Sequence, residues 1–188
     1  MYNPAGMMQW AADMCSRPDV GYSQAYRNYV TVNGITYFDC SSFTFFAMWI
    51  GGGLDVGSLG YSTTLSDYQQ GLANAWVVST MVQALQSLGW VQASAADPTQ
   101  WLPGDILVKT RTHTEILYSQ SPLECMGARN SSLPLSDQVA IHSCPTNYYD
   151  QVWRDPSSPT PPTPVPRVHG PMPAWLLKRA IQNGGRFF

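Results

Sequence analysis

The order of hydrophobic patterns along the chain constrains the fold most, because helical patterns dominate its first half and strand patterns its second half. Apolar residues recur at helical spacing over residues 4–16, from Cys40 to Ile50 and over 81–88. After the turn at Pro103-Gly104 the periodicity changes to short segments bounded by turn residues. Helices followed by strands indicate an α+β domain, with N-terminal helices packed on an antiparallel β-sheet. The strands are expected at 105–109, 113–118, 124–128, 138–142 and 151–154.

Turn-forming residues separate the segments of the first half. The dipeptide Asn33-Gly34 predicts a small hairpin, and residues 21–28 are typical of a loop. The polar, glycine-rich segment 54–74 predicts a long loop that forms one wall of a cleft. Thr80 stands three residues before a glutamine, a capping-box pattern that predicts a helix start at Thr80.

Proline marks the end of the expected domain. Eight prolines lie between residues 155 and 173, and such a segment is extended and semi-rigid. We therefore expect a catalytic domain over 1–154, a linker over 155–173 and a short tail over 174–188. The tail is too short to fold as a domain, and it either docks on the main domain or is the stub of a longer architecture.

Charge and hydropathy exclude several classes of protein. The formal net charge is −2 and no basic stripe is present, so we expect no nucleic-acid partner. No apolar run reaches the roughly 18 residues that a bilayer-spanning helix needs, so we expect no membrane insertion. Residues 1–17 lack a basic start followed by an apolar stretch, so we expect no signal peptide.

The cysteine spacing argues against a metal site. The four cysteines form no CxxC pair, and His142 and Cys144 are too close for the usual zinc-ligand spacing. We expect no metal and no cofactor. We also expect Cys15, Cys125 and Cys144 to be buried free thiols, the usual state of a cysteine in a core.

Cys40 has a different setting, because its pattern places it in the first turn of a buried helix. Asp39 precedes it and can cap that helix. A helix N-terminus stabilises a thiolate, and its N–H groups can also stabilise the oxyanion of a tetrahedral intermediate. A nucleophilic cysteine also needs a base. His169 lies in the proline-rich segment and is discounted, whereas the chemistry alone leaves both His113 and His142 open.

Three motifs then point to a family. The letters DCSSF at 39–43, GDILV at 104–108 and HTEILY at 113–118 occur in the order typical of the NlpC/P60 papain-like cell-wall peptidases, which the chain resembles over 21–154. The resemblance implies a papain-like fold, Cys40 as the nucleophile and His113, not His142, as the base.

The resemblance also implies a third catalytic residue and a substrate cleft. The family's third residue lies on the strand after the histidine, where this chain has no histidine. We predict Asn130, whose side-chain oxygen can accept a hydrogen bond from an imidazole N–H. Glu115 is the second choice, because adjacency along one strand rarely gives end-on geometry. Tyr22 and Ser41 are expected to contact the substrate, with the Tyr22 hydroxyl as an oxyanion donor.

The implied function is a phage-type peptidoglycan hydrolase that cleaves an amide bond of the cell-wall peptide by Cys-His thiol catalysis. It would act as an endolysin that waits in the host cytoplasm before release to the wall, or as a virion-associated tail lysin. Its partners would be peptidoglycan and other phage proteins. Two alternatives remain: an N-acetylmuramoyl-L-alanine amidase on the same scaffold, and a non-catalytic wall-binding or phage tail component.

Overall fold

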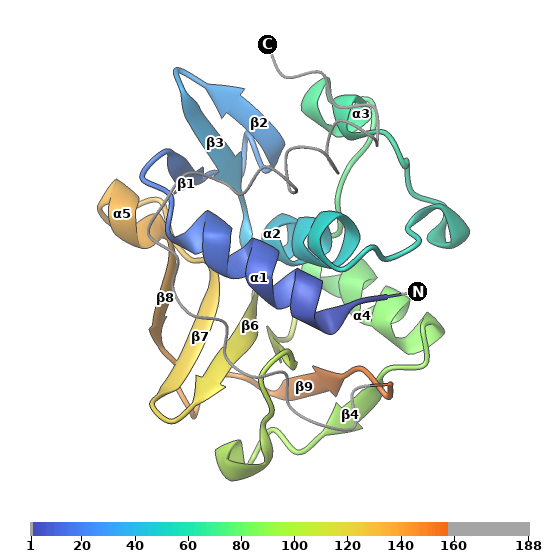
Figure 1. Cartoon of the computed structure of the whole chain (residues 1–188), viewed down its shortest axis with the longest axis vertical. Coiled ribbons are helices and arrows are strands. Elements are labelled where there is room, and N and C mark those ends of the chain that lie inside the picture. The colour runs from blue at the N-terminus through green and yellow to red at the C-terminus, as the bar shows by residue number, and fades with distance from the viewer. Residues whose placement is uncertain (1, 158–188) are drawn as a thin grey trace.

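The computed structural model describes residues 2–157, which form helices, one large antiparallel sheet and one small sheet (Figure 1). The mixed α+β class expected from the order of patterns is confirmed. Residues 158–188, which hold most of the predicted linker, the whole tail and His169, lie outside the described part of the chain.

The larger sheet contains six strands in the order β4-β9-β5-β6-β7-β8, and every neighbouring pair is antiparallel. The five strands predicted for the second half of the chain are all present, with ends shifted by two residues at most. The pattern did not reveal the sixth strand, β4. The strands are β4 Val91–Ala93, β5 Ile106–Lys109, β6 His113–Gln120, β7 Leu123–Ala128, β8 Val139–Ser143 and β9 Gln151–Arg154.

Helices cover one face of this sheet. The first helix, α1, packs across β7 and β8, and the second, α2, packs on β6 and β7 (Figure 1). Apolar residues of both helices share one core with the sheet residues Ile116 and Met126. The helices are α1 Pro4–Cys15, α2 Cys40–Phe46 with its π-helical continuation η1 Ala47–Gly51, α3 Leu65–Gln69, α4 Val78–Ser87 and α5 Leu135–Gln138, with short 3-10 turns η2 Gly57–Leu59 and η3 Pro98–Gln100.

The other face of the sheet carries a second, smaller cluster. Leu107 and Leu117 alternate with the residues that face the helices, and they pack with Trp101, Tyr149 and Val152. Alternation along a strand sends neighbouring side chains to opposite faces. The loop after β8, which carries Tyr149, therefore covers the face of the sheet that points away from α1 and α2.

The small sheet has the order β1-β3-β2, in which β1 (Val20–Tyr22) runs parallel to β3 (Ile35–Phe38) and β2 (Asn28–Val32) runs antiparallel to it. The predicted hairpin is confirmed, since Asn33 and Gly34 have φ angles of 51° and 80°. The loop expected over 21–28 is wrong at its start, because Gly21 and Tyr22 belong to β1.

Two other expectations for the first half need correction. Helix α4 begins at Val78, two residues before Thr80, and the Thr80 Oγ1 accepts a hydrogen bond from the Val77 N–H at 3.1 Å. Segment 54–74 contains η2 and α3, and the α3 residue Tyr68 is buried with its ring 5.4 Å from that of Phe45. The segment therefore contains a helix, α3, that packs against α2 through Tyr68.

None of the helices within residues 2–157 is both long enough and apolar enough to cross a membrane.

Candidate active site

Cys40 is the first residue of α2, as its sequence pattern predicted. Asp39 caps the helix: its Oδ1 accepts a hydrogen bond from the Ser42 N–H at 2.7 Å, and the Asp39 N–H donates to the Ser42 Oγ at 2.9 Å. This reciprocal capping box fixes the start of the helix. The N–H groups of a first turn have no acceptor within the helix, so the Cys40 sulfur lies at the partially positive end of α2.

Arg27 holds the capping aspartate in place from the segment before β2. Its Nε lies 2.6 Å from the Asp39 Oδ2, and its Nη2 donates to the Ser41 Oγ at 3.0 Å and to the Trp76 carbonyl. Ser41 is only 2% exposed and donates in turn to the Asp39 Oδ1. The structure therefore corrects the expected substrate contact of Ser41, because this hydroxyl is enclosed in the network that anchors Asp39.

His113 opens β6, where it lies close enough to Cys40 for this residue to raise the pKa of the imidazole. Its Nε2 also lies 3.1 Å from the Glu115 Oε1. Burial alone lowers the pKa of His113, but the hydrogen bonds to Cys40 and Glu115 and the negative charges of both groups raise this pKa to about 9. The imidazolium form of His113 is therefore stabilised between a sulfur and a carboxylate.

Glu115 is the side chain that accepts a hydrogen bond from His113. It lies two residues further along β6 and is 2% exposed. Its Oε1 also lies 2.9 Å from the His142 Nε2, and its Oε2 accepts a hydrogen bond from the Tyr149 hydroxyl. Burial raises the pKa of Glu115, but the hydrogen bonds to His113 and His142 and their charges lower it to about 2. The buried carboxylate is thus charged and supplied with donors, as a buried charge must be.

Gly127 on β7 makes room for this carboxylate. A Cβ atom at Gly127 would lie 2.9 Å from the Glu115 Cγ, which is closer than side-chain carbons approach one another. The strand next to β6 therefore offers space where a side chain would otherwise stand, and Glu115 occupies that space.

Asn130 lines the same hollow as His113, but no hydrogen bond joins these two side chains. It lies in the loop after β7, where its Oδ1 accepts a hydrogen bond from the Ser132 N–H at 2.9 Å. The partner of His113 is Glu115, the second choice from sequence. The objection to Glu115 fails because residues i and i+2 share a face of the strand, and the carboxylate reaches back to the ring along that face.

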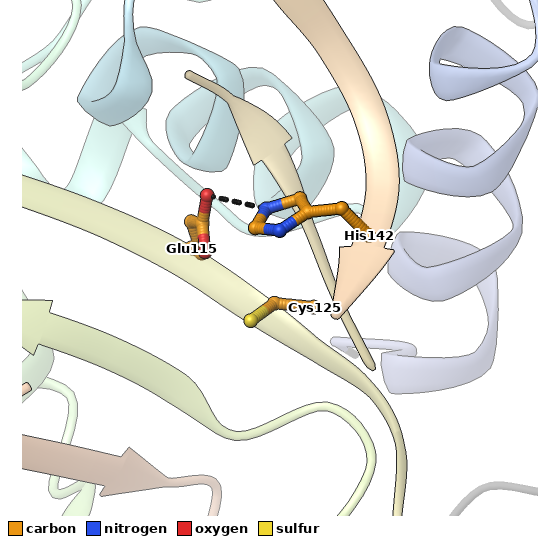
Figure 2. A group of neighbouring side chains, drawn as sticks. All are labelled: Glu115, Cys125 and His142. Carbon is orange, nitrogen blue, oxygen red and sulfur yellow. Dashed lines mark hydrogen bonds and ion pairs between the residues drawn. The ribbon is translucent and has the colours of Figure 1, made fainter. Parts of the chain in front are cut away.

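His142, expected to be a structural residue outside the site, is the main residue that sequence reasoning missed. It lies on β8, and its Nδ1 is 2.9 Å from the Ser143 carbonyl oxygen while its Nε2 faces Glu115 (Figure 2). Both ring nitrogens of His142 thus face hydrogen-bond acceptors. The register between β7 and β8, which pairs Cys125 with His142, brings this ring to the site.

Cys125 and Cys144 form a disulfide with a Cα–Cα distance of 5.0 Å, so the expectation of buried free thiols is wrong for these two residues. Side-chain atoms of Glu115, Cys125 and His142 lie within 4.8 Å of one another and could hold a metal ion (Figure 2). A disulfide sulfur has no thiolate to offer, so in this state the group supplies two metal ligands and not three.

Two tyrosines flank the Cys40–His113 pair. Burial, together with the negative charges of Cys40 and Asp39, raises the pKa of Tyr22, whose hydroxyl accepts a hydrogen bond from Gln24. The ring of Tyr148 lies 5.9 Å from that of His113, and its pKa is raised by burial and by the charges of Glu115 and Cys40. Both hydroxyls therefore keep their protons at neutral pH, and the Tyr22 O–H can donate a hydrogen bond.

Comparison of the chain with models of protein families, with curated proteins and with solved structures found no match.

Proposed function

We propose that this protein is a cysteine hydrolase that cleaves an amide bond of bacterial peptidoglycan. Cys40 is the nucleophile, His113 is the base and Glu115 orients His113. The observation that carries the proposal is the order of these three side chains: a cysteine at a helix N-terminus, an imidazole whose pKa that cysteine raises, and a buried carboxylate 3.1 Å from the imidazole. This is the arrangement that thiol catalysis requires.

The reaction follows from this order. Cys40 gives its proton to His113, and the thiolate attacks the carbonyl carbon of the amide. The oxyanion accepts hydrogen bonds from the Cys40 backbone N–H and the Tyr22 hydroxyl. His113 then protonates the departing amine as the C–N bond breaks, which leaves a thioester on Cys40. A water molecule, deprotonated by His113, hydrolyses the thioester and restores the thiol.

The choice of peptidoglycan and a papain-like fold rests on the resemblance of the DCSSF, GDILV and HTEILY motifs to NlpC/P60 peptidases. The phage origin rests on the resemblance of the upstream residues 21–24 (GYSQ) and Arg27 to phage-encoded lysins. In this proposal the enzyme acts as an endolysin, held in the host cytoplasm until the wall becomes accessible, or as a lysin carried by the virion. Its partners are the wall and other phage proteins. The carboxylate beside His113 favours an active hydrolase over a non-catalytic wall-binding component, because it supplies a third residue.

The test is digestion of purified Gram-positive cell walls by the wild type, Cys40→Ala and Cys15→Ala. Cys15 is the matched control, since among residues 2–157 it is the other cysteine outside the disulfide. Wild type and Cys15→Ala are expected to clear the walls and release amines, and Cys40→Ala is not. Equal activity in all three contradicts the nucleophile. A released lactyl-linked sugar chain identifies the amidase instead of the endopeptidase. Wall binding without cleavage favours the non-catalytic alternative.

A further inference from the structure

A hollow of about 300 Å³ opens beside His113 on the face of the sheet that carries Glu115. The start of β6, the loop after β7, the end of β8 and the loop that follows β8 all contribute to its lining. Small-molecule sites span roughly 300–1,000 Å³, so this hollow suits one residue of a peptide.

The charges of this hollow do not balance. Three basic side chains, His113, Arg129 and His142, line it together with one acidic side chain, Glu115. Both oxygens of Glu115 already have hydrogen-bond partners, because Oε1 faces the two histidines and Oε2 accepts a hydrogen bond from Tyr149. The positive charge of Arg129 is therefore left over once the internal pairs have been formed.

Arg129 has a fixed backbone and an uncommitted head group. Its N–H donates to the Gln138 carbonyl at 2.7 Å, which extends the pairing of β7 with β8 beyond the strand ends. Its Nη1 lies 3.5 Å from the Asp137 carbonyl oxygen, the limit of a hydrogen bond. Within residues 2–157 it takes part in no ion pair. A guanidinium has five donors in a fork that matches a carboxylate, and most of these donors remain for a ligand.

We propose that Arg129 binds a carboxylate of the substrate, and that this carboxylate belongs to the residue released as the amine. The carboxylate is assigned to the leaving residue on the basis of the proposed function, in which His113 protonates the leaving amine. His113 itself lines the hollow. Tyr148 lines the hollow as well, with its ring 5.9 Å from that of His113, and burial and the charges of Glu115 and Cys40 raise its pKa. The enzyme thus selects substrates that carry a free carboxylate close to the bond it cuts.

Such a carboxylate is either the terminal carboxylate of a peptide or a side-chain carboxylate, and small probes separate the two. The full chain with Cys40→Ala is titrated with N-acetylglycine, N-acetylaspartic acid α-amide and N-acetylglycinamide, while NMR follows the ring signals of His113 and His142. One or both acids are expected to shift these signals, and the neutral amide is not. The shifts are expected to vanish with Arg129→Gln and to persist with Arg111→Gln, which removes an exposed positive charge outside the hollow. Equal effects of acids and amide, or shifts that survive Arg129→Gln, overturn the proposal.

Cleavage gives a second readout on the wild-type background. Once the scissile bond is known, two stem peptides are compared that differ only in a carboxylate or a carboxamide on the leaving residue. The wild type is expected to prefer the carboxylate by at least about tenfold in kcat/KM, and Arg129→Gln is expected to abolish that preference. Walls that are cleaved without any such preference overturn this inference alone. Acid binding through Arg129 in a chain that cleaves no wall supports the subsite and contradicts the proposed hydrolase.

Discussion

Gly127 and Glu115 face each other across neighbouring strands so closely that a Cβ atom on Gly127 would come within 2.9 Å of the Glu115 Cγ. Both residues lie on the face of the sheet that points away from α2, where β6 and β7 run side by side. The buried carboxylate that holds His113 therefore depends on a missing side chain on the next strand. This dependence can be tested without changing any group that takes part in the proposed chemistry.

Gly127→Ala is expected to push Glu115 away from His113 and to reduce kcat by about 10²-fold, the effect of a shift of about 1 Å at a catalytic group. Wall clearance and peptide cleavage measure the loss. Gly71→Ala is the control, because Gly71 has a φ of 74° and no atoms near its missing side chain. That variant should lose stability through backbone strain and keep its activity. Full activity in Gly127→Ala would contradict the role given to Glu115.

Glu115 and Asn130 can be compared directly as the residue that orients His113. Glu115→Gln keeps the size of the side chain and removes its charge, so kcat is expected to fall by at least about 10²-fold, as for other triads that lose their carboxylate. Asn130→Ala is expected to leave kcat nearly unchanged, because its amide oxygen serves the Ser132 N–H. Steady-state kinetics on one peptide decides between them, and the reverse ranking would restore the original prediction for Asn130.

The pH dependence of stability follows from two coupled shifts. The pKa of His113 is raised from 6.5 to about 9, so its contribution to stability is complete below pH 6.5 and is lost as the pH rises to 9. The pKa of Glu115 is lowered from 4.5 to about 2, so its contribution is complete above pH 4.5 and is lost as the pH falls to 2. The melting temperature should therefore be highest between pH 4.5 and 6.5.

The His113→Gln variant provides the control for this profile. It should lose the decline between pH 6.5 and 9 and keep an acidic decline. The wild type should also lose activity as the pH passes 9, because His113 then has no proton to give to the leaving amine. An alkaline decline of stability that is identical in both proteins would show that His113 is not its source.

The Cys125–Cys144 disulfide lies next to His142 and Tyr149, the two other side chains bonded to Glu115. Cys144 directly follows Ser143, whose carbonyl faces His142, and the Cys125 sulfur lies 3.7 Å from the Tyr149 hydroxyl. The double variant Cys125→Ser/Cys144→Ser is expected to lose roughly 3 kcal/mol of unfolding free energy, for a bridge between cysteines 19 residues apart. Urea unfolding measures this loss. Wild type treated with a reductant should match the variant, and an unchanged midpoint in both would contradict a structural role for the bridge.

Local patterns were sufficient for most of the fold. The helix at 4–15, the hairpin at Asn33-Gly34 and the start of α2 at Cys40 each depend on residues close in sequence, through spacing, turn chemistry or capping. The strands of the second half follow their turns in the same way. The short elements β1, β4, α3 and α5 were missed, because three to five residues carry too little periodicity to be recognised.

The surroundings of His113 depend on long-range pairing, which the sequence does not display. His142 reaches Glu115 through the register that sets Cys125 opposite His142 on β7 and β8. The space above Gly127 exists only once β6 and β7 are side by side. The disulfide likewise requires Cys144 to return to β7 after the loop that contains α5. The family resemblance and the acceptor chemistry of an amide therefore favoured Asn130, and Cys125 and Cys144 were expected to be free thiols.

The central claim is that Cys40 and His113 act as a thiol–imidazole pair, and alkylation by iodoacetamide at pH 7 tests it without any assumption about the substrate. The rate is measured at Cys40 and Cys15 by peptide mapping, in the wild type and in His113→Ala. We expect alkylation of Cys40 to slow by at least about tenfold in the variant, because no base remains to take the thiol proton, while the rate at Cys15 stays the same. Equal rates at Cys40 in the two proteins would contradict the pair, and with it the proposed hydrolase.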